Sequence, residues 1–89
     1  MEWRNIPSLA ALRAFESVSR VGSYSAAARE LNVTHAAIAQ HVRAIENELQ
    51  TTLVMREGRG MALTDQVRAL ADALTAGFSQ IISGVEAIS

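Results

Sequence analysis

The 89-residue sequence contains no cysteine and no lysine, has a single proline, and has an aromatic content of only 4%. Without cysteine, the chain can form neither a disulfide-stabilised scaffold nor a thiolate metal site. Its apolar runs are much shorter than the roughly 20 residues that a transmembrane helix needs. The first residues show no signal-peptide pattern. We therefore expect a cytoplasmic protein with no membrane partner.

The charge of the chain is close to neutral and unevenly distributed. A net charge of −1 is not typical of a nucleic-acid-binding protein. Residues 1–63 hold seven arginines against six glutamates, whereas residues 64–89 hold one arginine against three acidic residues. Because every basic residue is arginine, geometric contacts are favoured over a diffuse positive field. The total charge argues modestly against a DNA partner, and the distribution argues for one.

Residues 23–49 predict two helices joined by a tight turn. Ser25 is a suitable N-cap for the first helix, and the three alanines at 26–28 allow a second helix to cross closely. Asn32 can adopt the left-handed conformation that often ends a helix, and Thr34 can cap the next one. Two short helices with so few residues between them form a helix-turn-helix.

The second of these helices carries small and polar side chains opposite its apolar stripe. The stripe consists of Ile38, Val42, Ile45 and Leu49. The opposite face carries Ala36, Gln40, Arg43 and Asn47, flanked by His35 and Ala39. Small residues let a helix approach base pairs, and glutamine and arginine form bidentate hydrogen bonds with base edges. An ordinary solvated face is the alternative, and the helix and turn before it favour DNA.

The segments on either side complete a small DNA-binding domain. A preceding helix is predicted to begin at Ser8 and to end at Gly22, with an inward face of Leu9, Leu12, Phe15 and Val18. Strand-like runs at 53–56 and 61–63 surround the glycine-containing stretch 57–60, which predicts a β-hairpin wing. Arg56 and Arg59 near its tip would reach phosphates or a narrow minor groove, unless they only solvate the turn.

The last segment predicts a long helix that starts at Thr64 and Asp65. At about 1.5 Å per residue it would be roughly 36 Å long, too long to be covered by so small a domain. Its apolar residues follow a seven-residue repeat, and we assign a second copy of the chain as their partner. Gly77 and Gly84 are interpreted as positions where that copy approaches closely, with a frayed helix end as the alternative. The predicted dimerisation residues are Val67, Leu70, Leu74, Gly77, Phe78, Ile81, Gly84, Val85 and Ile88.

From about residue 6 to residue 89 the chain resembles the N-terminal DNA-binding domain and linker helix of LysR-type transcriptional regulators. The resemblance rests on LRAF at 12–15, GSYSAAA at 22–28, LNVT at 31–34, VRAIE at 42–46, Leu49, REGRG at 56–60 and LT at 63–64. It implies a bacterial, mainly α winged helix-turn-helix, with three helices and a short hairpin in residues 1–63. A dimerisation helix at 64–89 follows, and the larger C-terminal domain that binds a small-molecule effector is absent from this chain.

The resemblance also implies a set of DNA contacts, a dimer on an inverted-repeat operator and, for the full-length regulator, usually a tetramer. The implied contacts are Ser23, Ser25, Thr34, His35, Ala36, Ala39, Gln40, Arg43, Arg56 and Arg59. Some positions depart from the family pattern. His35 and Ala36 replace Gln-Pro or Gln-Ser, Ala39 replaces serine, and Gln50 replaces glycine. Since alanine offers only methyl contacts, Gln40, Arg43 and His35 are expected to specify the sequence.

No pattern in the sequence predicts an enzyme, a cofactor or a metal. His35 and His41 are six residues apart and project from different helix faces, so they cannot form a zinc pair without distant ligands. No nucleophile elbow or phosphate loop is present. The rival hypothesis is a winged-helix protein-interaction module that does not bind DNA, and its best support is the net charge. A dimeric repressor without an effector domain is a second rival.

Overall fold

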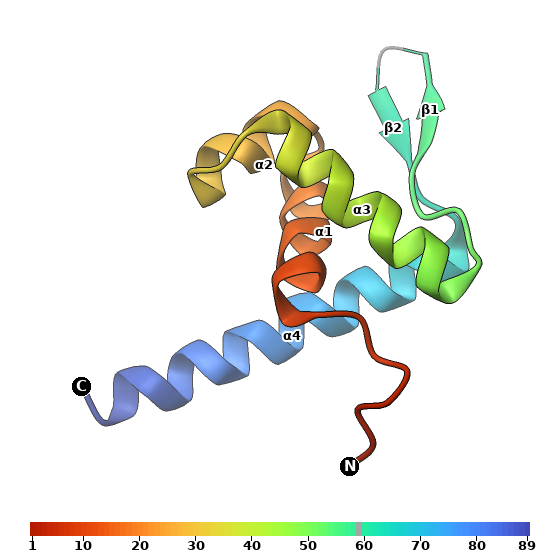
Figure 1. Cartoon of the computed structure of the whole chain (residues 1–89). Helices are drawn as coiled ribbons and strands as arrows, with labels where there is room; N and C mark the ends of the chain where they lie inside the picture. The colour runs from red at the N-terminus through yellow and green to blue at the C-terminus, as the bar shows by residue number, and fades with distance from the viewer. Residues whose placement is uncertain (59) are drawn as a thin grey trace.

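The computed structural model describes residues 1–58 and 60–89, so Arg59 lies outside the described residues. The element order confirms the predicted winged helix-turn-helix with a long final helix (Figure 1). The elements are α1 (Leu9–Val21), α2 (Tyr24–Leu31), α3 (His35–Leu49), β1 (Met55–Glu57), β2 (Gly60–Ala62) and α4 (Asp65–Ala87). In the described part, no helix is long and apolar enough to cross a membrane.

Side-chain caps set the first residue of each helix. The hydroxyls of Ser8, Thr34 and Thr64 accept hydrogen bonds from backbone N–H groups at the starts of α1, α3 and α4, as predicted. The predicted cap of α2 is wrong. Ser23 rather than Ser25 accepts the hydrogen bond from Ala26 N, at 2.9 Å. Because Gly22 ends α1 in the left-handed conformation (φ 80°), the extended residue directly after it becomes the next cap.

Three left-handed residues end the first three helices. Gly22 and Asn32 were expected in this role, and Gln50 takes it at the end of α3 with φ 52°. The backbone therefore turns as it would with the glycine that the family usually has, although glutamine pays a steric cost there. The side-chain amide of Gln50 donates a 2.6 Å hydrogen bond to the carbonyl oxygen of Asn47.

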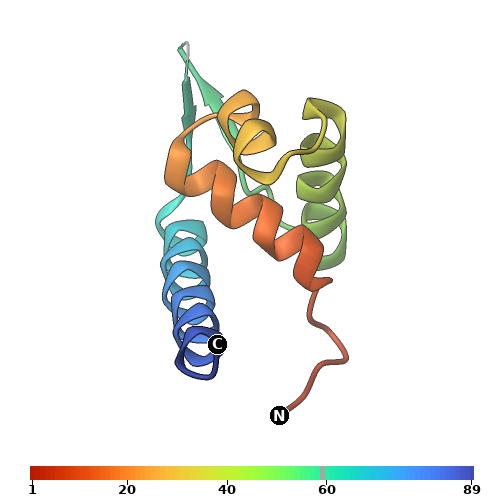
Figure 2. The same ribbon diagram turned by 90° about the vertical axis from the view of Figure 1, so that its left-hand side faces the viewer.

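Helix α1 lies at the centre of the hydrophobic core (Figure 2). Phe15 packs in one cluster with residues of α1, α3, α4 and the segment before β1, namely Ala11, Leu12, Ile45, Leu53, Val67 and Ala71. Val18 packs in a second cluster with residues of α1, α2 and α3, namely Ala14, Ala27, Ala28, Ile38 and Val42. The prediction that Leu9 and Leu49 lie on the buried faces of their helices is wrong, since Leu9 is 54% and Leu49 38% exposed. Both stand at helix ends, beyond the reach of the neighbouring elements.

The hairpin is short, and the segment that precedes it is anchored to α3 and to the core. Its two strands are antiparallel, with Arg56 opposite Met61. The segment that leads into it is held by Glu46 of α3, whose carboxylate accepts a 2.9 Å hydrogen bond from Leu53 N. Leu53 itself is buried. The wing is therefore fixed relative to α3 at its base.

Only the first half of α4 packs against the rest of the chain. Val67 and Ala71 are buried in the core, and Leu70, Leu74 and Phe78 pack partly against it. The expectation that Val67 contacts a second copy needs correction, because a side chain that is only 2% exposed offers a partner no surface. The heptad repeat there reflects packing on α1 within the chain. Beyond Phe78 every residue is exposed, and the helix extends away from the domain (Figure 1).

Side-chain hydrogen bonds join α1 to α2. Arg20 donates from Nε to Glu16 Oε2 and from Nη1 to Glu30 Oε2, both at 2.9 Å. Ser17 donates a 2.7 Å hydrogen bond to Glu30 Oε1. The guanidinium of Arg20 and the Ser17 hydroxyl lower the pKa of Glu30 from 4.5 to about 2. The ionised carboxylate of Glu30 is thus favoured by the fold.

We expect the Gln50→Gly variant to be more stable than the wild type by about 0.5–1 kcal/mol, because glycine adopts the left-handed conformation without steric cost. Urea unfolding measures the difference. Gln50→Ala is the control, since it keeps the Cβ and should not be stabilised. A glycine variant no more stable than the alanine variant would contradict the interpretation.

The lowered pKa of Glu30 predicts an acid dependence of stability. The contribution of ionised Glu30 is complete above about pH 4.5 and is lost as the pH falls towards about 2. Since the side chain is 35% exposed, we expect screening to limit this contribution to about 1 kcal/mol. The stability gap between wild type and Glu30→Gln, from urea unfolding at a series of pH values, should shrink over that range. Glu48→Gln, at the exposed end of α3, is the control, and a gap independent of pH would refute the prediction.

Candidate nucleic-acid interface

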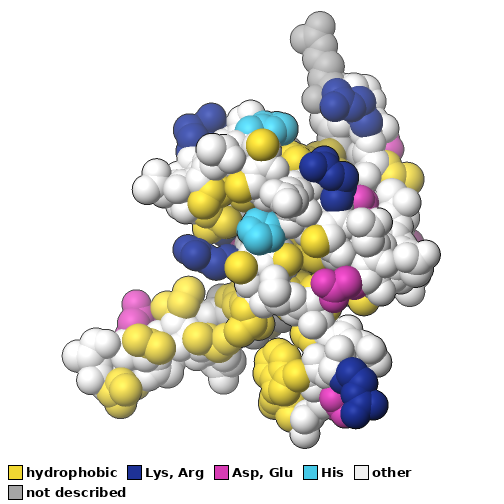
Figure 3. All heavy atoms as spheres, viewed as in Figure 1, with side chains coloured by type: hydrophobic (Ala, Val, Ile, Leu, Met, Phe, Trp, Pro, Cys, Tyr) yellow, Lys and Arg dark blue, Asp and Glu magenta, His cyan; other side chains and the backbone are white. Residues whose placement is uncertain are grey.

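The apolar stripe of α3 is buried, and this fixes which face of the helix meets solvent. Ile38, Val42 and Ile45 are at most 1% exposed. The predicted contacts Thr34, His35, Ala36, Gln40 and Arg43 are all exposed, and Ala39 is half-buried at the edge of the same face. Arginine and histidine side chains are spread over α2, α3 and the hairpin on the side of the molecule shown in Figure 3. The face of α3 outside the core therefore carries polar side chains interspersed with alanines.

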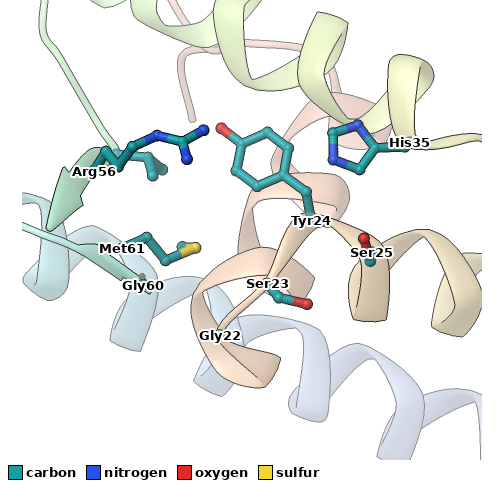
Figure 4. Close-up of a pocket in the computed structure, with 9 residues that line it drawn as sticks. Gly22, Ser23, Tyr24, Ser25, His35, Arg56, Gly60 and Met61 are labelled. Carbon is teal, nitrogen blue, oxygen red and sulfur yellow. The ribbon is translucent and has the colours of Figure 1, made fainter. Parts of the chain in front are cut away.

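A cleft lies between the hairpin and the start of the helix-turn-helix. It has a volume of about 540 Å³, and the residues that line it include Ser23, Tyr24, Ser25, His35 and Arg56. In Figure 4 the Tyr24 ring stands between His35 and Arg56, with the hydroxyl end towards Arg56. The ring centroids of Tyr24 and His35 are 5.5 Å apart. The structure thus brings together four predicted contacts, Ser23, Ser25, His35 and Arg56.

Tyr24 is the residue of this cleft that sequence reasoning did not single out. Its ring is half-buried against the core cluster around Val18, and burial raises the pKa of its hydroxyl. The group therefore remains a protonated hydrogen-bond donor at neutral pH. As the only tyrosine of the chain, directly after a helix cap, it could have been noticed in the sequence.

Three glutamates of the domain are engaged by the fold, whereas Glu48 on α3 and Glu57 on the hairpin are exposed. Glu16 and Glu30 pair with Arg20, and Glu46 accepts hydrogen bonds from the backbone of Leu53 and Val54. Arg43 and Arg56, by contrast, are exposed, and no ion pair is found for either within residues 1–58 and 60–89. The guanidinium groups of Arg43 and Arg56 can therefore contact a ligand directly, despite the total charge of −1.

Hydroxyl, imidazole and guanidinium groups in one cleft are donors suited to phosphate oxygens, and the α3 face beside them offers donors suited to base edges. Within the described residues, no cluster of histidine, aspartate and glutamate could hold a metal ion. The surface has the chemistry of a DNA-binding site.

Comparison with known proteins adds independent information. The family described as "Bacterial regulatory helix-turn-helix protein, lysR family" matches residues 9–68. The AhcY transcriptional activator HvrB of Rhodobacter capsulatus is 51% identical over 97% of this chain and 30% of its own length. The regulator TrpI of Pseudomonas aeruginosa is 46% identical over 88% of this chain and 26% of its own length.

Among solved structures, Vibrio fischeri DarR in complex with DNA superposes with a TM-score of 0.71 at 27% identity, over 88% of this chain and 27% of DarR. The chain spans less than a third of the length of the curated relatives it matches. These likenesses therefore concern the helix-turn-helix and the helix after it.

Proposed function

The chain belongs to the LysR family of bacterial regulatory helix-turn-helix proteins, and we propose that it binds an inverted-repeat DNA operator as a homodimer, with α3 in the major groove. It is a DNA-binding helix-turn-helix domain of a family of transcriptional regulators and not an enzyme. The observation that carries the proposal is the exposed face of α3, which presents Gln40 and Arg43 beside the cleft that contains Arg56.

Each part of the surface has a role in this proposal. Gln40 and Arg43 read base edges, while Ala36 and Ala39 let the helix approach and contact a thymine methyl group. Ser23, Tyr24, Ser25, His35 and Arg56 hold backbone phosphates in the cleft, and Thr34 lies where α3 begins. The hairpin follows the backbone or the minor groove. Arg59, outside the described residues, is kept as a contact because of its place in the sequence between the two strands.

Homodimerisation is assigned to the second half of α4, while residues 1–63 bind DNA. Ile81, Ile82, Val85 and Ile88 are between 56% and 89% exposed, which is a large apolar surface for a small domain. Hydrophobic side chains gather along this end of α4 in Figure 3. A Cβ atom at Gly77 or Gly84 would meet nothing within 4 Å, so both positions are open to a second helix. Leu70, Leu74 and Phe78 would border the contact on the side of the core.

The regulator as a whole is proposed from the family. A small-molecule effector would bind only in a C-terminal domain outside this chain, and the full-length protein would assemble as a tetramer. The greater length of the relatives is consistent with such a domain. The same proposal places the protein in the cytoplasm, where bacterial DNA lies, with no membrane partner.

Arg43 tests base reading by α3. If Arg43 contacts a guanine edge, Arg43→Ala should weaken binding to an operator selected from random duplexes by about 1–3 kcal/mol and relax the preference at one position of each half-site. Arg68→Ala, an exposed arginine on α4, is the matched control. A uniform loss over all sequences would assign Arg43 to a phosphate instead, and unchanged binding by the folded variant would remove it from the interface.

The second half of α4 tests the dimer. Ile81→Asp would bury a charge between two helices and should give monomers in sedimentation velocity, with steeply reduced operator affinity. Gly77→Leu should also weaken the dimer, because its side chain would hold the helices apart. Ser79→Asp, on the polar side of α4, is the control.

Gly77→Ala separates a packing role of the glycines from simple helix propensity, since alanine favours a helix by about 1 kcal/mol over glycine. Dimerisation by Gly77→Leu that is as tight as that of the wild type would show that the glycines lie outside the contact.

A further inference from the structure

Within the described ranges, a single side-chain hydrogen bond joins α4 to another helix. Thr75 Oγ1 donates to Glu16 Oε2 over 2.7 Å, between residues 59 positions apart in the sequence. The other contacts of α4 with the domain are apolar, through Val67, Ala71 and their neighbours. Apolar packing is non-directional and tolerates a change of helix angle, whereas a short hydrogen bond does not.

The acceptor of this bond is held in place from its other side. Glu16 is only 6% exposed, and its carboxylate also accepts hydrogen bonds from Arg20. Arg20 in turn binds Glu30 of α2. A continuous chain of polar contacts therefore runs from α4 through α1 to the first helix of the helix-turn-helix. Because both carboxylates share one guanidinium, the position of Glu16 is linked to α2 as well as to α4.

The space beside this chain of contacts offers room for α4 to tilt once the hydrogen bond is lost. A groove of about 390 Å³ separates α4 from α1 and α2, and its walls include Arg13, Leu31, Phe78, Ile81 and Ile82. About 20 Å of helix follow Thr75 before Ile88, at 1.5 Å per residue. A tilt of about 10° would thus move the end of α4 by roughly 3 Å, close to the rise of one base pair.

We infer that the hydrogen bond from Thr75 to Glu16 is a positioning contact that fixes the direction of α4 relative to α2 and α3, and so sets the half-site spacing that a dimer accepts. The second part rests on the proposed function, since it requires dimerisation through α4. The first part concerns one chain alone. Thr75 acts through α4 and does not touch DNA.

Spin-label distances test the direction of α4 without DNA. Because the chain has no cysteine, Glu48→Cys on α3 and Ser83→Cys on the polar side of α4 give one defined pair, diluted with unlabelled chains. When Thr75 is kept, we expect one narrow distribution of distances between the two labels. With Thr75→Val, which keeps the shape of the side chain but removes the hydroxyl donor, we expect a broader or shifted distribution. Thr75→Ser restores the donor and should restore the narrow distribution. Identical distributions in all three would overturn the inference.

The role in half-site spacing is tested with the unlabelled chain. Its affinity is measured for a series of duplexes whose half-sites are moved apart or together by single base pairs. Wild type and Thr75→Ser should prefer one spacing, and Thr75→Val should reduce that preference by roughly tenfold, since a hydrogen bond to a charged group is lost. An unchanged spacing profile of Thr75→Val would overturn the spacing role, even if the distances broaden and so support the positioning of α4. A wild type that binds every spacing equally would overturn the proposed dimer and the spacing role, while the distances still decide whether Thr75 fixes α4.

Discussion

Burial of Phe15 and Val18, both fully enclosed, ties α1 to every other helix of the chain. A domain of about 60 residues has little interior, so a central helix shared by all the others is an economical way to build a core. Phe15 holds α3, α4 and the segment before the hairpin, and Val18 holds α2 and α3. The positions of the DNA-binding elements relative to one another therefore follow from the packing of one helix.

This packing also explains how a chain with a net charge of −1 can present a DNA-binding surface. Burying Ile38, Val42 and Ile45 turns Gln40 and Arg43 outwards. Three of the glutamates serve the fold: Glu16 and Glu30 bind Arg20, and Glu46 fixes the base of the hairpin. Arg43 and Arg56 remain available, and the geometry of guanidinium contacts matters more here than the total charge. The family match removes the support that net charge gave to a pure protein-interaction module.

Local signals in the sequence predicted much of this architecture, because caps and left-handed residues act within a few positions. Ser8, Thr34, Thr64, Gly22 and Asn32 all have their predicted roles. The sequence did not identify which of two nearby serines caps α2. Ser23 and Ser25 are both suitable caps, and the position at which α1 ends decides between them. Contacts between residues far apart in the sequence could not be predicted from such local signals. A heptad repeat does not say whether Val67 meets α1 or a second chain, and no local pattern links Thr75 to Glu16 or aims Tyr24 into the cleft.

The central claim is that the exposed face of α3 and the cleft beside the hairpin together form the DNA surface. Amide chemical shifts of the isotope-labelled chain, followed during titration with a selected operator duplex, test this most directly. We expect large changes at the starts of α2 and α3, along α3 to Arg43 and in the hairpin, with small changes in the second half of α4. Changes concentrated on α4 or on the outer turns of α1, with α3 unaffected, would contradict it.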